Sequence, residues 1–126
     1  MKIDLPLLKQ SCVEGKLVES ESEVEFDIDT SVYSEERWEQ NFPHLASKET
    51  LFKYISRVKN SHSPENVEVA CMLKALFCFM ESSQIKTYKD FAKMFILSNP
   101  EYLDRLVSKL RNSFNIILEG SSTKNS

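Results

Sequence analysis

Glycine, proline and cysteine are scarce in this chain of 126 residues. Two glycines and four prolines leave few tight turns, which disfavours an all-β fold and favours helices. The three cysteines, Cys12, Cys71 and Cys78, are an odd number at wide spacing, so we expect no disulfide framework. We interpret Cys71 and Cys78 as buried free thiols in a protein of the reducing cytosol.

Long apolar runs and an excess of positive charge are also missing. The most apolar segment, residues 67–80, contains Glu68 and Lys74 and is too short to span a bilayer. The formal net charge is -3 and the pI is about 5.4, whereas a general binder of nucleic acid or of an anionic membrane needs a basic surface. We therefore expect one intracellular domain without a membrane partner, and nucleic acid is not a favoured partner.

Motifs that carry catalysis or hold a cofactor are absent from the sequence. It has no P-loop, no Gly-x-Gly-x-x-Gly, no HExxH and no Gly-x-Ser-x-Gly. His44 and His62 lie in polar connections without a recognisable nucleophile nearby. The acidic run over residues 19–29 lacks the glycine of a calcium loop, and we interpret it as a charged strand edge that discourages pairing with other strands. We predict no enzyme activity, no metal and no cofactor.

Helical periodicity dominates the chain after residue 30. Five segments have apolar residues at helical spacing, and they cover residues 31–42, 47–58, 63–80, 87–95 and 100–117. Each begins at a residue that can cap a helix, namely Thr30 or Ser31, Ser47, Ser63, Thr87 and Asn99. The segment 63–80 is apolar nearly all round, which predicts a helix at the centre of a bundle.

The N-terminal residues indicate strands rather than helices. Ile3 and Leu5 alternate with polar residues, as do residues 23–29, and Gly15 can provide a turn between them. The two segments could pair as an antiparallel ribbon lying on the helices. The predicted fold is mainly α, a small bundle of about five helices with a short N-terminal β element. Residues 1–22 form the β or irregular segment, 23–120 the helical domain that ends near Gly120, and 121–126 a disordered tail.

The first predicted helix carries Trp38, the only tryptophan of the chain. Trp38 falls on one side of this helix with Phe42, and Tyr33 lies beside them. These rings could seal the helix to the core, or they could anchor a partner protein, since Trp and Tyr are enriched at the energetic centres of interfaces. The sequence leaves both interpretations open, and Tyr33, Trp38 and Phe42 are the candidate partner-binding residues.

Residues 87–110 also scan like a helix-turn-helix, in which the second helix would enter the major groove of DNA. That helix carries Arg105, Lys109 and Arg111. Two features count against DNA binding: Ile96 stands where the turn often has glycine, and Glu101 and Asp104 would face the phosphates. A helical hairpin that closes the bundle is the favoured interpretation, and a small DNA-binding regulator is the alternative.

Four stretches carry a family resemblance: D-T-S…E-x-R-W-E-x-N-F-P (residues 29–43), L-F-x-Y-I-x-R-V (51–58), L-K-A-L-x-C-F (73–79) and F-N-I-I-L-E-G-S-S-T-K-N (114–125). They resemble the tail assembly chaperones of long-tailed bacteriophages and prophages of Gram-positive bacteria. The similarity covers most of the chain after residue 22.

This resemblance implies a mostly helical protein that coats the long tape measure protein, keeps it soluble and assists polymerisation of the tail tube around it. It also implies a longer frameshifted form that recruits the tail tube protein. Such a chaperone works in the cytoplasm of the bacterial host and is not expected in the mature virion. Whether this chain forms a homo-oligomer is left open by the sequence.

Overall fold

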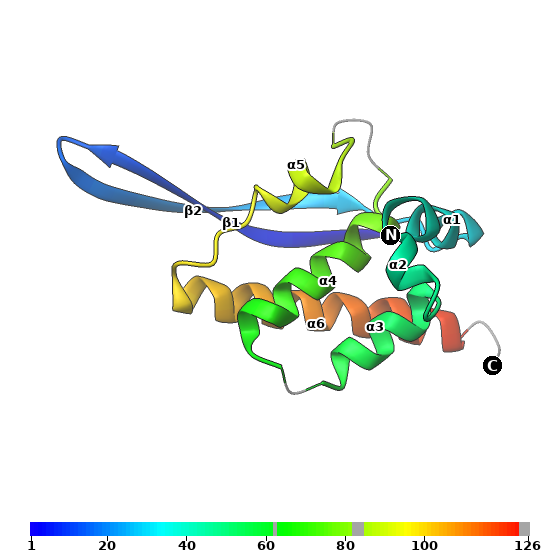
Figure 1. Ribbon diagram of the computed structural model, residues 1–126. Coiled ribbons are helices and arrows are strands. Elements are labelled where there is room, and N and C mark those ends of the chain that lie inside the picture. Colours follow the sequence, from blue (N-terminus) through cyan, green and yellow to red (C-terminus); the bar gives the residue numbers. More distant parts are fainter. Residues whose placement is uncertain (62, 82–84, 124–126) are drawn as a thin grey trace.

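The computed structural model describes residues 1–61, 63–81 and 85–123, and it is mainly helical (Figure 1). The elements in chain order are β1 (Lys2–Val13), β2 (Lys16–Asp27), α1 (Val32–Asn41), α2 (Pro43–Ala46), α3 (Leu51–Lys59), α4 (Glu65–Phe79), α5 (Tyr88–Ala92) and α6 (Pro100–Thr123). The predicted class, mainly α with an N-terminal β element, is confirmed. The described residues form six helices, however, and not five.

The additional helix is α2, a single turn that the sequence did not indicate. Pro43 follows the end of α1, as predicted, and then occupies the first position of α2, where its fixed φ suits a helix start. Ser47, the predicted cap of the next helix, lies instead at the C-terminal end of α2. The cap of α3 is Thr50, whose hydroxyl accepts a hydrogen bond from the Lys53 amide at 3.3 Å.

The other helix ends follow the sequence to within a few residues. Ser31 and Thr87 cap α1 and α5, as predicted, and the Oδ1 atom of Asn99 accepts a hydrogen bond from the Tyr102 amide at 3.0 Å at the start of α6. Helix α4 begins at Glu65, one residue after Pro64. Helix α6 continues past Gly120, and of the predicted tail, residues 124–126 lie outside the described residues.

Helix α4 lies at the centre of the helical body, as its apolar sequence predicted. It packs against α1, α3, α5 and α6, and nine of its fifteen residues are buried. The apolar stripe of α6 is also buried against the core, with Leu106 and Leu110 fully enclosed. Within the residues that the structure describes, no helix is long and apolar enough to cross a membrane.

The β element is a two-stranded antiparallel ribbon that is longer than the sequence indicated. Each strand has twelve residues, Lys2 pairs with Asp27 and Val13 pairs with Lys16, so β2 runs across residue 22. The root of the ribbon lies between α5 and α6, whereas the rest extends beyond the helical body (Figure 1). From Lys9 to Ser20 every residue is exposed, and we call this part the arm.

Both faces of the ribbon are covered at its root. Leu5 and Pro6 are adjacent and both buried, although neighbouring residues of a strand point to opposite faces. Phe26 of β2 meets Phe91 of α5 edge to face, with ring centroids 5.5 Å apart. On the α6 side, the Tyr102 hydroxyl donates a hydrogen bond to the Pro6 carbonyl at 2.8 Å. A two-stranded ribbon is only marginally stable alone in water. These contacts therefore stabilise its root and hold it against the helices.

The arm ends in a two-residue turn, as Gly15 predicted. Glu14 and Gly15 have φ angles of 53° and 76°, which is the left-handed conformation that a tight hairpin turn requires at both central residues. Glycine adopts this conformation without strain, while a residue with a side chain is strained by about 1–2 kcal/mol. Glu14 is therefore the less suitable residue of the two.

Substitutions in this turn should change the stability of the arm alone. Gly15→Ala places a Cβ in open space but strains the backbone, so amide hydrogen exchange in the arm should speed up at least about fivefold, the equivalent of about 1 kcal/mol. Glu14→Asn should slow it, because asparagine tolerates positive φ. Exchange in α4 serves as the control. An equal change in α4 would mean that the arm and the core open together.

Candidate interaction surfaces

The fold keeps two of the three aromatic residues that the sequence grouped, Trp38 and Phe42, in contact and separates Tyr33 from them. Trp38 is 1% exposed, and its indole N–H donates a hydrogen bond to the Glu49 carbonyl at 3.0 Å. Its ring packs against Tyr54 and Phe42, with centroids 4.7 Å and 5.6 Å away. Phe42 is half-buried and also contacts Tyr88. Trp38 therefore joins α1 to α3, and its ring faces the core.

Tyr33 has the opposite environment, because 52% of its surface is exposed. It follows Val32, which is also exposed, at the start of α1. The Arg37 guanidinium lies over the Tyr33 ring, 5.0 Å from its centroid. Arg37 itself is held by the Asp29 carboxylate at 2.8 Å and donates a hydrogen bond to the Met80 carbonyl. The exposed ring therefore rests on a fixed cation.

The charge that fixes Arg37 is itself stabilised. Hydrogen bonds from Ser31 lower the pKa of the Asp29 carboxyl, and the Arg37 guanidinium acts in the same direction. Asp29 thus keeps its negative charge well into the acidic range. An aromatic ring held in one orientation loses little conformational entropy when it meets a partner.

A cavity of about 330 Å³ adjoins Tyr33. Its apolar lining comes from Phe77, Met80 and Ile85, and its polar lining from Arg37, Gln40, Asn41 and Lys86. We call this cavity, together with Val32 and Tyr33, the Tyr33 face. A cavity lined by both kinds of side chain can contact the apolar and the polar residues of an amphipathic helix.

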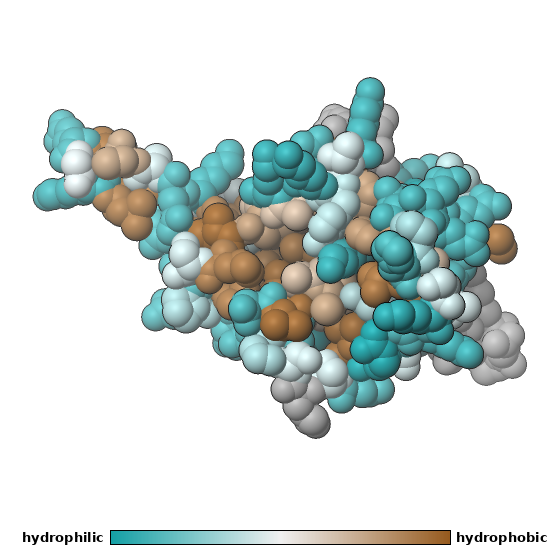
Figure 2. Space-filling view, in the orientation of Figure 1, coloured by the Kyte–Doolittle hydropathy of each residue, from teal (hydrophilic) through white to brown (hydrophobic). Residues whose placement is uncertain are grey.

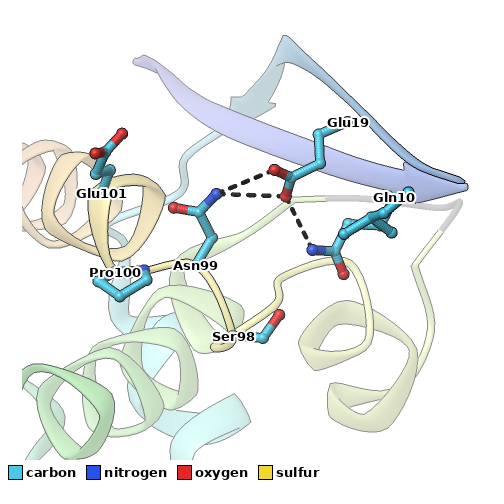
Figure 3. Close-up of a pocket in the computed structure, with 7 residues that line it drawn as sticks. Gln10, Glu19, Ser98, Asn99, Pro100 and Glu101 are labelled. Atoms are coloured by element: carbon cyan, nitrogen blue, oxygen red, sulfur yellow. Dashed lines mark hydrogen bonds between the residues drawn. The ribbon is translucent and has the colours of Figure 1, made fainter.

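A second hollow lies between the arm and the start of α6 (Figure 3). This cleft of about 440 Å³ is lined by Gln10, Leu17, Glu19, Ser98, Asn99, Pro100 and Glu101. The Glu19 carboxylate accepts hydrogen bonds from Gln10 at 2.9 Å and from the Asn99 Nδ2 atom at 3.3 Å (Figure 3). Asn99 therefore caps α6 with its oxygen and holds the arm with its nitrogen.

The tip of the arm carries apolar side chains that are about half exposed or more. Leu17 is 66% exposed, and Val13, Val18 and Cys12 are exposed beside it. Figure 2 shows this apolar tip separated from the body by hydrophilic side chains. The sequence interpretation missed these residues, although Leu17 and Val18 are adjacent apolar residues near a turn and thus break the alternation of a one-faced ribbon.

A third hollow is an apolar groove between α4 and α5. It has a volume of about 110 Å³ and is lined by Val69, Ala70, Leu73, Tyr88, Ala92, Phe95 and Leu97. All of these except Tyr88 have side chains without polar groups, and Leu97 is exposed at the edge. In Figure 2 an apolar area occupies this part of the surface. We call it the α4/α5 groove.

The residues of the DNA-binding alternative make contacts within the protein. Arg105 forms an ion pair with Glu21 of the ribbon, and Arg111 forms one with the buried Glu68 of α4 at 2.5 Å. Tyr102, near the start of the would-be recognition helix, is fully buried. Lys109 is exposed. This arrangement is that of a helix packed on the bundle, and it does not favour DNA binding.

Groups that could hold a metal ion do not converge among the described residues. Cys12 is exposed, Cys71 is half-buried and Cys78 is buried, and all three are free thiols. Comparisons with protein-family models, with curated proteins and with solved structures found no match to the chain.

Substitution of Trp38 and of Tyr33 should have very different effects on stability. Trp38→Ala should lower the free energy of unfolding by about 3–5 kcal/mol, because it empties a fully buried site. Tyr33→Ala should lower it by less than about 1 kcal/mol, since it removes an exposed ring and one cation–π contact. Urea denaturation followed by circular dichroism measures both. Equal losses would place Tyr33 in the core as well.

The three thiols should react with a labelling reagent in the order of their exposure. Cys12 on the arm should be modified fastest. Cys78 should be modified slowest, because burial raises its pKa to about 12, which reduces the reactive thiolate roughly three-thousandfold relative to a pKa of about 8.5. Mass spectrometry of peptides from a dilute, native sample gives the rates. Slow labelling of Cys12 would mean that the arm lies against the body.

Proposed function

We propose that this protein is a tail assembly chaperone of a long-tailed bacteriophage or prophage, and that it binds the tape measure protein through the Tyr33 face. Support comes from the four stretches that resemble this family, two of which contribute residues to the Tyr33 face. The first stretch, residues 29–43, contains Asp29, Tyr33 and Arg37 together. The third, residues 73–79, contributes Phe77 to the same cavity.

The observation that carries the proposal is the exposed, fixed ring of Tyr33 beside a cavity that has both polar and apolar side chains in its lining. A chaperone for a long helical client needs apolar contacts on the surface of a charged body, and each contact must be weak enough to be displaced by the growing tube. The Tyr33 face has this character: one aromatic ring, one aliphatic neighbour and a cavity with two cations on its rim. Occupancy of the client then comes from many copies bound side by side.

An amphipathic client helix would place an apolar residue in the cavity and an acidic residue near Lys86 and Arg37. In binding of this kind, the chaperone recognises apolar residues that lie at helical spacing on the client. The chaperone would keep the tape measure protein soluble in the host cytoplasm by covering such apolar stripes until tail tube subunits replace it. Trp38 takes part indirectly, because it holds α1 on α3.

Co-expression with the tape measure protein of the same genome tests the proposal. The tape measure protein should become soluble and should co-purify with many copies of the wild-type chain. Tyr33→Ala should weaken the affinity for the tape measure protein at least about 30-fold, since an aromatic anchor of this kind contributes about 2 kcal/mol or more. Fewer copies should therefore co-purify.

Ile116→Ala is the matched control, because Ile116 is 54% exposed and lies on α6 away from the Tyr33 cavity. It should leave co-purification unchanged. An insoluble tape measure protein with no wild-type chain bound to it would refute the chaperone proposal. Equal binding by wild type and Tyr33→Ala would place the client elsewhere on the surface.

A further inference from the structure

The tip of the arm is apolar on both of its faces. The register pairs Cys12 with Leu17 and Ser11 with Val18. Since side chains alternate along a strand, Cys12 and Leu17 lie on one face, and Val13 and Val18 lie on the other. A ribbon with one apolar face can be covered by lying flat on a surface. A tip with two apolar faces is covered only when it enters a groove.

The α4/α5 groove has the chemistry and the size to receive one side chain of this tip. Its volume of about 110 Å³ equals that of about four water molecules, at roughly 30 Å³ each, which is the scale of one branched aliphatic side chain. Its walls are almost entirely apolar, and Phe95 and Leu97 line the side from which the chain continues toward α6. In the isolated chain the tip is largely exposed and the groove is open.

The tip of one molecule is held away from the groove of the same molecule. Asn99 and Arg105 of the α6 region bind Glu19 and Glu21 of β2, and the arm extends from these contacts away from the body (Figure 1). We propose that the arm tip of one copy inserts into the α4/α5 groove of a second copy, with Leu17 as the inserted side chain.

Charge favours this contact over pairing between two arms. Residues 9–23 include two lysines and four glutamates, whereas residues 86–93, which contain α5, include three lysines and one aspartate. The arm itself, residues 9–20, has two lysines and two glutamates, so the negative charge lies at its base, in Glu21 and Glu23. The exposed ribbon over residues 9–23 thus has a formal net charge of -2 and residues 86–93 one of +2. Two such ribbons repel one another at long range, whereas the attraction to α5 steers the two copies together.

Each copy carries one tip and one groove on different parts of its surface. Such a contact is head-to-tail, so it builds a ring if the rotation between copies closes and an open chain if it does not. The contact involves few side chains, far fewer than the roughly 20–30 residues a side of a stable interface. Assembly therefore depends on protein concentration. This inference does not depend on the proposed client.

Three variants that each add one negative charge separate the tip from the groove. Leu17→Glu removes the inserted side chain, Leu97→Glu places a charge at the edge of the groove, and Ile116→Glu is the control on α6. All three positions are exposed, so the fold should persist, and circular dichroism checks it. Ala92→Gln, which fills the groove without a charge, is a second groove variant. Light scattering on the full chain under reducing conditions then gives the average mass against concentration.

The wild type and Ile116→Glu should grow in mass with concentration, while Leu17→Glu and each groove variant alone should remain monomeric. An equimolar mixture of Leu17→Glu with Leu97→Glu should form a dimer and no larger species, because the intact groove of the first accepts the intact tip of the second. A wild type that is monomeric up to its solubility limit overturns the proposal. So does assembly by the Leu17→Glu variant alone, and so does a mixture that remains monomeric.

Discussion

The structure depends on the covering of a two-stranded ribbon at its root. A ribbon of two strands has two faces and two edges, and it has no third strand to stabilise it, so it is marginally stable unless other elements cover it. Here α5 supplies Phe91 against Phe26 on one side, and α6 supplies the Tyr102 hydroxyl, which donates to the Pro6 carbonyl on the other. Burial raises the pKa of Tyr102 to about 12, so the hydroxyl keeps its proton and remains a donor. Helices α5 and α6 thus each cover one side of the root, and both also pack against α4.

The parts of the fold that could be predicted are those that depend on residues close together in the sequence. The all-round apolar character of residues 65–79 placed α4 at the centre, and the caps Ser31, Thr87 and Asn99 came from side chains that act within three residues of themselves. The length of the ribbon could not be predicted, because Lys9 to Ser20 is exposed and carries no one-sided apolar pattern. Helix α2 was missed because a single turn after proline has no periodicity to detect.

The candidate surfaces required the tertiary structure for a similar reason. Trp38 and Tyr33 are close in sequence and have the residue types of an interface, and only packing against Tyr54 and Glu49 distinguishes the buried ring from the exposed one. Arg105 and Arg111 looked available to a nucleic acid until their partners Glu21 and Glu68, more than forty residues away in each case, were placed beside them. The α4/α5 groove joins residues from two helices and the segment after them, a combination that no local pattern encodes.

Helix α6 has a mechanical consequence that follows from its length. Its 24 residues make a rod about 36 Å long at 1.5 Å per residue, and the rod runs from the root of the arm to the opposite end of the body (Figure 1). At one end Asn99, Tyr102 and Arg105 bind the ribbon, while Leu110 and Phe114 farther along are locked into the core. The same rigid helix therefore holds the arm and packs into the core, so the direction of the arm relative to the body is coupled to the packing of α6, together with the contact of Phe91 with Phe26.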